Sequence, residues 1–214
     1  MTGWFGLLVL GLLLGVRHAL DPDHVVAIGT ISARTPTVRR SVGVGALWGL
    51  GHTLTILGVG GTIVLMRVAI SPRAGLAMEF GVALMLIALG LLNLLNARHA
   101  EPAAPSQARP FIIGMVHGMA GSAAIALLVL ATINDPVLGM FYLLLFGMGT
   151  VVGMIGVTTL MTAPMTMMVR RTAVSRRWLT AAAGVVSLVF GVLMVQALGG
   201  PLALLAADPA FIPR

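Results

Sequence analysis

The stretch that decides the fold lies near the amino terminus and reads Arg17-His18-Ala19-Leu20-Asp21-Pro22-Asp23-His24. Two histidines and two aspartates fall within residues 18–24, and apolar sequence flanks them over residues 3–16 and 25–31. Ionisable side chains in membrane-compatible sequence are costly, and they usually face a protein interior or a water-filled path where they carry function. The stretch is therefore the first candidate for a functional site.

Pro22 predicts a break in the helix that carries this stretch. Proline lacks a backbone N–H, its ring clashes with the carbonyl group four residues earlier, and it disfavours a helical conformation at Asp21. The pattern favours Asp21 as the N-cap of a second half-helix, with Pro22 at its first position and Asp23 in its first turn. A single helix over residues 3–33 would be about 45 Å long, whereas a hydrocarbon core is about 30 Å thick. We expect a broken or strongly tilted span with the cluster near the membrane midplane.

The composition indicates an integral membrane protein, because 58% of the 214 residues are hydrophobic and only 9% are charged. The net charge of +7 comes from arginines that mostly lie between apolar runs, which favours a role in membrane orientation over nucleic-acid binding. The chain has no cysteine, which excludes disulfides, thiolate metal sites and thiol catalysis.

Apolar runs of about 20 residues predict an all-α fold with six transmembrane helices. The expected spans cover residues 3–33 (broken at Pro22), 42–66, 75–96, 111–134, 137–168 and 178–206. Arginines follow the first, third and fifth spans, so we expect those loops in the cytoplasm and the N-terminus outside. The two arginines of the second loop run against this orientation.

The two halves of the chain resemble one another. Gly15-Val16-Arg17-His18 aligns with Gly114-Met115-Val116-His117 at an offset of 99, and Trp48-Gly49-Leu50-Gly51 aligns with Phe146-Gly147-Met148-Gly149 at an offset of 98. Three spans per half would give the halves opposite orientations, which predicts a 3+3 inverted repeat with substrate held near the midplane. The expected domains are a first repeat over 1–96, a cytoplasmic linker over 97–110 and a second repeat over 111–214.

The first stretch offers four nitrogen and oxygen donors: His18, Asp21, Asp23 and His24. A helix break lets them converge, and without sulfur donors other than methionine they suit a divalent ion such as Ni²⁺, Co²⁺, Mn²⁺ or Zn²⁺. The alternative is a structural cluster in which Arg17 and Asp21 neutralise one another.

Two further histidines are candidate ligands. His52 follows glycines that allow close helix approach, and His117 occupies the repeat equivalent of His18, although either could simply hydrogen-bond a neighbouring helix. His99 lies in the linker, where we expect it to be solvated and inert. Asn93, Asn96 and Gln196 are expected to hydrogen-bond between helices. The expected metal-site residues are His18, Asp21, Asp23, His24, His52 and His117.

The spacing His-x4-Asp-His in the first stretch, together with Leu50-Gly51-His52-Thr53, resembles the nickel/cobalt transporter family, and in particular its short urease-accessory-type branch. The resemblance covers about residues 11–57, and it departs from the classical members in having six candidate spans instead of eight. It implies a multi-pass carrier of Ni²⁺ or Co²⁺ in the bacterial inner membrane. The residues of the first stretch would handle the metal, with His52 as their partner.

The expected function is therefore secondary transport of a divalent metal ion, which is the substrate and not a cofactor. The expected partners are this ion, the lipid bilayer and possible nickel-enzyme maturation proteins, without nucleic acid. Two alternatives stay open: an intramembrane metalloenzyme, and an accessory protein that delivers nickel to urease or hydrogenase maturation. The sequence has no obvious nucleophile and no HExxH helix, which favours the transporter.

Overall fold

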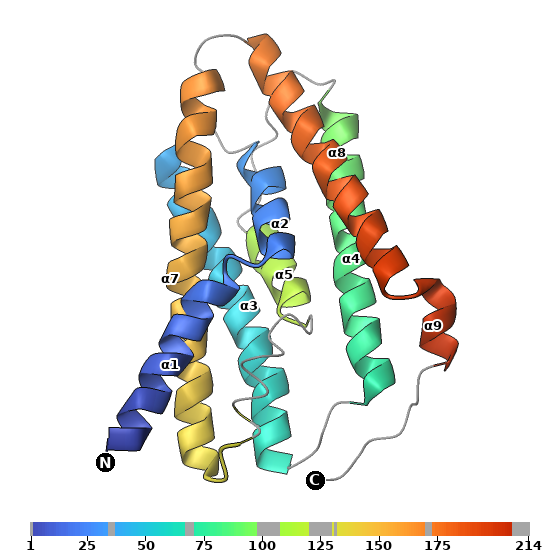
Figure 1. Cartoon of the computed structure of the whole chain (residues 1–214). Helices are drawn as coiled ribbons and strands as arrows, with labels where there is room; N and C mark the ends of the chain where they lie inside the picture. The colour runs from blue at the N-terminus through green and yellow to red at the C-terminus, as the bar shows by residue number, and fades with distance from the viewer. Residues whose placement is uncertain are drawn as a thin grey trace.

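The computed structural model describes residues 2–33, 37–66, 71–97, 108–119, 130, 132–169 and 173–206. In this part of the chain the regular structure is helical, without a strand. The helices in Figure 1 are α1 (Thr2–His18), α2 (Pro22–Ser32), α3 (Val38–Met66), α4 (Pro72–Asn96), α5 (Ala108–His117), α7 (Pro136–Val169), α8 (Ala173–Ala197) and α9 (Gly200–Ala206).

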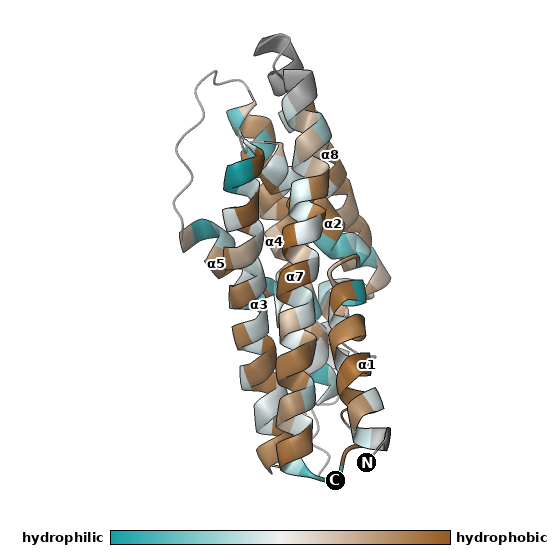
Figure 2. Cartoon of the chain, turned by 90° about the vertical axis from the view of Figure 1, so that its left-hand side faces the viewer, coloured by the Kyte–Doolittle hydropathy of each residue, from teal (hydrophilic) through white to brown (hydrophobic). Residues whose placement is uncertain are grey.

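Four helices are long and apolar enough to cross a membrane: α3, α4, α7 over Pro136–Thr166 and α8 over Arg177–Ala197. The pair α1 and α2 forms one more candidate span, with a bend of 52° between its two parts. Figure 2 shows apolar residues along much of the length of α1, α3 and α7. The chain is an all-α, multi-pass membrane protein, as predicted.

The helix break occurs at Pro22, where the sequence predicts it. α1 ends at His18, the chain turns over residues 19–21, and α2 begins at Pro22 with Asp21 as its N-cap residue. The Asp21 side chain does not cap the helix. Because the break follows His18 directly, the last side chain of α1 and the first turn of α2 meet at one place.

Two expected spans depart from the structure, the fourth at a turn inside it and the sixth at its C-terminal end. The fourth, 111–134, begins within α5, but Gly118 and Met119 form a turn after His117, and residues 120–129 lie outside the described residues. The sixth, 178–206, is wrong at its C-terminal end, because α8 stops at Ala197. Gly199 and Gly200 follow with φ of 80° and 71°, a left-handed conformation that ends helices and that glycine adopts readily.

The helices of the two halves pack in a reciprocal pattern. α1 packs on α7, α5 packs on α3, α3 and α7 pack on each other, and α4 pairs with α8. Glycines permit these close approaches: a Cβ added to Gly15 would strike the carbonyl oxygen of Phe146, and one added to Gly114 would strike the carbonyl oxygen of Trp48. The contact of Gly15 in the first half therefore has a counterpart at Gly114 in the second.

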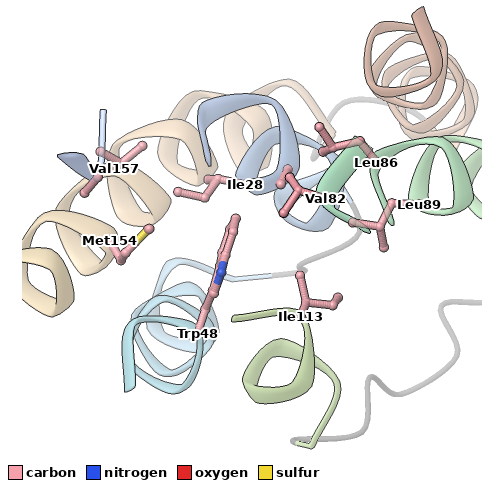
Figure 3. Close-up of a cluster of buried hydrophobic side chains, with 10 residues drawn as sticks. Ile28, Trp48, Val82, Leu86, Leu89, Ile113, Met154 and Val157 are labelled. Atoms are coloured by element: carbon pink, nitrogen blue, oxygen red, sulfur yellow. The ribbon is translucent and has the colours of Figure 1, made fainter. Parts of the chain in front are cut away.

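A buried apolar cluster lies beside the break and fixes its position. Trp48 of α3 is fully buried and lies among Ile28 of α2, Ile113 of α5 and Met154 of α7, as Figure 3 shows. Asn93 of α4 donates its Nδ2 hydrogen to the carbonyl oxygen of Thr30 at 2.8 Å, so its expected interhelical bond is confirmed. The same expectation is wrong for Asn96, whose Nδ2 donates to the carbonyl oxygen of Leu92 one turn earlier in α4. These contacts hold α2 and α5 against the long helices.

Candidate metal site

Five ionisable residues meet at the helix break, each at most 8% exposed. His18 ends α1, Asp23 and His24 open α2, His52 lies within α3, and His117 ends α5. His52 and His117, which come from two helices outside the first stretch, thus complete the cluster.

Short contacts join the five side chains. His18 Nε2 lies 3.0 Å from His52 Nε2, a distance at which one nitrogen donates a hydrogen bond to the other. Asp23 accepts from His117 Nε2 at 3.0 Å through Oδ2 and from His24 Nδ1 at 3.2 Å through Oδ1. The single carboxylate therefore connects α2 to α5.

Three ring nitrogens in the cluster are buried without a hydrogen-bond partner: His24 Nε2, His52 Nδ1 and His117 Nδ1. Buried polar atoms are nearly always paired, so each unpaired one calls for an explanation, and an ion is one such explanation. A neutral imidazole that donates through one nitrogen keeps a lone pair on the other. The cluster thus presents several lone pairs inside a buried site.

Two groups of residues have donor atoms close enough to bind one ion. One group is His18, His24 and His52, and the other is Asp23, His24 and His117; within each group the donor atoms lie within 4.8 Å of one another. Imidazole nitrogen with carboxylate oxygen suits a first-row divalent transition metal. The arrangement is therefore chemically suited to nickel or cobalt.

Comparison with known proteins identifies the relatives of this chain. The family described as NicO, High-affinity nickel-transport protein, matches residues 4–101. The chain is also 35% identical over 210 residues to the urease accessory protein UreH of Bacillus sp. (strain TB-90), which covers 90% of this chain and 92% of that protein. The chain belongs to this nickel-transport family. It is a transporter-type protein and not an enzyme. Comparison with solved structures finds no match.

Within this member of the nickel-transport family, five of the six expected site residues come together, and Asp21 stands apart. The Asp21 side chain is 33% exposed, belongs to neither donor group, and accepts from His18 Nδ1 at 2.8 Å. The alternative pairing of Arg17 with Asp21 is wrong, because His18 is the residue that pairs with Asp21 and Arg17 is exposed. His117 approaches the first stretch as expected, through Asp23. His99 lies outside the described residues.

The sequence reasoning missed two aromatic side chains of the site. The ring centroid of Phe146 lies 5.3 Å from that of His18, and the centroid of Trp48 lies 5.6 Å from that of His117. Both side chains are almost fully buried, so they present apolar surface to the histidines. The signal was available, because the alignment of the two halves at an offset of 98 pairs these two residues.

Proposed function

We propose that the chain is a secondary transporter that carries Ni²⁺, or alternatively Co²⁺, across the bacterial inner membrane. The observation that carries the proposal is the buried cluster of imidazole and carboxylate donors at a helix break in a multi-pass membrane protein. Ionisable groups at such a position commonly mark an ion pathway. Membership of the nickel-transport family supports nickel as the substrate.

In this proposal His18, Asp23, His24, His52 and His117 bind the ion, and Asp21 positions His18. A histidine that binds a metal through one nitrogen usually donates its other N–H to a carboxylate or carbonyl group, which fixes the ring orientation. The bond from His18 Nδ1 to Asp21 Oδ2 fits this role. It leaves His18 Nε2 to face His52.

We further propose that the chain is a 3+3 inverted repeat, with a first repeat over 1–96, a linker over 97–110 and a second repeat over 111–214. The reciprocal approaches of Gly15 to Phe146 and of Gly114 to Trp48 support it, because both partners shift by the offset found in the sequence. A second pair of approaches, Gly149 to Leu12 and Gly51 to Phe111, follows the same rule. Rocking of one repeat against the other would then expose the ion to each side in turn.

The orientation in this proposal places the N-terminus outside and the linker in the cytoplasm, following the arginine-rich loops. Import is the direction that we propose, because it would supply nickel on the cytoplasmic side to maturation proteins of nickel enzymes. The name of the Bacillus relative, urease accessory protein, is consistent with such a supply role.

Uptake of radioactive nickel into proteoliposomes tests the function. We expect the wild-type chain to accumulate nickel, His24→Ala to lose uptake, and the linker variant His99→Ala to keep it as the matched control. Membrane insertion of each variant is checked by its recovery with the vesicles. Wild-type uptake no greater than that of empty vesicles, or full uptake by inserted His24→Ala, would contradict the proposal.

A further inference from the structure

We propose that the site offers the ion two alternate positions that share His24. The first position is made by His18, His24 and His52, and the second by Asp23, His24 and His117. This inference rests on the proposed function, since both positions bind the transported ion. It differs from a single site in which all five side chains surround one ion together.

Each position already contains one pair of donors at the spacing that a metal ion requires. Two ligand atoms that each lie about 2.1 Å from an ion, at a right angle to one another, are about 3.0 Å apart. His18 Nε2 and His52 Nε2 are 3.0 Å apart, and so are His117 Nε2 and Asp23 Oδ2. The two pairs therefore each match adjacent ligands of a separate ion position, once the proton shared within each pair leaves Nε2 for the unpaired Nδ1 of His52 or of His117, or is released as the metal binds.

His24 lies between the two pairs. Its ring centroid is 4.6 Å from that of His18 and 4.4 Å from that of His117, whereas the rings of His52 and His117 are 6.3 Å apart. Among the described residues, no ligand group combines the His18–His52 pair with the Asp23–His117 pair. His24 donates toward Asp23 through Nδ1 and keeps an unpaired Nε2. The single lone pair of His24 Nε2 binds one ion at a time, so the two positions are filled alternately and one ion can exchange its other ligands around His24.

The two positions differ in chemistry and in origin. The first presents three imidazole nitrogens, all from the first half of the chain, and it adjoins Phe146. The second replaces two of these nitrogens with a carboxylate oxygen of Asp23 and the imidazole of His117, which lies in the second half, and it adjoins Trp48. Movement of the ion from the first position to the second would thus transfer it from ligands of one half to ligands shared by both halves.

A double-mutant cycle on nickel affinity tests the two positions. The nickel association constant of the purified full-length chain is measured by titration calorimetry for the wild type, His52→Ala, His117→Ala and the double variant, with His99→Ala as control. If either position binds alone, the double variant loses far more affinity than the product of the two single losses, because each single variant keeps one intact position. If one ion is bound by both histidines at once, the two single losses of affinity multiply in the double variant, and that result would overturn the inference.

X-ray absorption of the bound nickel gives a second, independent measurement. We expect His117→Ala to bind nickel through imidazole nitrogens of the first position, and His52→Ala to show a carboxylate ligand with fewer imidazoles. Identical spectra for the two variants would overturn the two positions. If either alanine variant cannot be purified, His52→Gln or His117→Gln replaces it in the same cycle. If the wild-type chain binds nickel and the affinity losses of the two single variants multiply in the double variant, only this inference is refuted. If the wild-type chain neither binds nor transports nickel, the proposed function and this inference are both refuted.

Discussion

Substitution of Gly15 by alanine should loosen the contact between α1 and α7 and damage the metal site one turn away. The added Cβ would strike the carbonyl oxygen of Phe146 and lie 2.9 Å from the backbone nitrogen of Thr150, closer than real Cβ contacts allow. Relief requires α1 to move by about 1 Å, and overpacking of this kind costs about 1–3 kcal/mol. Alanine recovers about 0.5–1 kcal/mol of helix preference, so the net loss lies between about 0 and 2.5 kcal/mol, with about 1 kcal/mol as the central expectation.

The same movement would carry His18 away from its 3.0 Å contact with His52. Because metal sites tolerate displacements of about 0.5 Å, nickel affinity should fall by about tenfold to a hundredfold. The assay is thermal unfolding in detergent together with nickel titration, and the control is Gly6→Ala on the same helix. A Cβ at Gly6 meets no atom within 4 Å, so this variant should keep nickel affinity and gain slightly in stability. Equal stability and equal affinity of the two variants would refute the packing argument.

Three other predictions follow from single features. Asp21→Asn should bind nickel about tenfold to a hundredfold more weakly in equilibrium dialysis, because the amide orients the His18 ring less firmly; an unchanged dissociation constant would remove Asp21 from its positioning role. Asn93→Leu should lower the free energy of unfolding by about 1 kcal/mol, whereas Asn96→Leu, which loses a bond only within its own helix, should change it less; the reverse order would contradict the assignment. A cysteine at position 104 should react with an impermeant reagent only after the membrane is opened, and labelling in intact cells would reverse the proposed orientation.

The sequence predicts the break well because its cause is local. Pro22 excludes a continuous helix through its own chemistry, and the same argument positions Asp21 as the N-cap residue. The side-chain role of Asp21 could not be predicted, because a capping bond and a bond to His18 compete, and the turn after α1 decides between them.

Other misses have equally physical origins. A count of apolar residues does not register helix ends, so the expected sixth span continued through Gly199-Gly200-Pro201, although this sequence is typical of a helix stop. The repeat alignment pairs Trp48 with Phe146, but an alignment does not show that aromatic side chains face histidines, because that contact depends on how the helices pack. His52 and His117 were predicted from glycine-rich neighbours and from the repeat, and both reach the break.

The central claim is that the transported ion binds at the helix break. The most direct test is an anomalous difference map, recorded at the nickel absorption edge from crystals of the full-length chain grown with nickel. The account predicts the strongest peak about 2.1 Å from a ring nitrogen of His24, with further ligands among His18, Asp23, His52 and His117. A nickel peak at His99 or beside a methionine sulfur, with no peak beside His24, would contradict it.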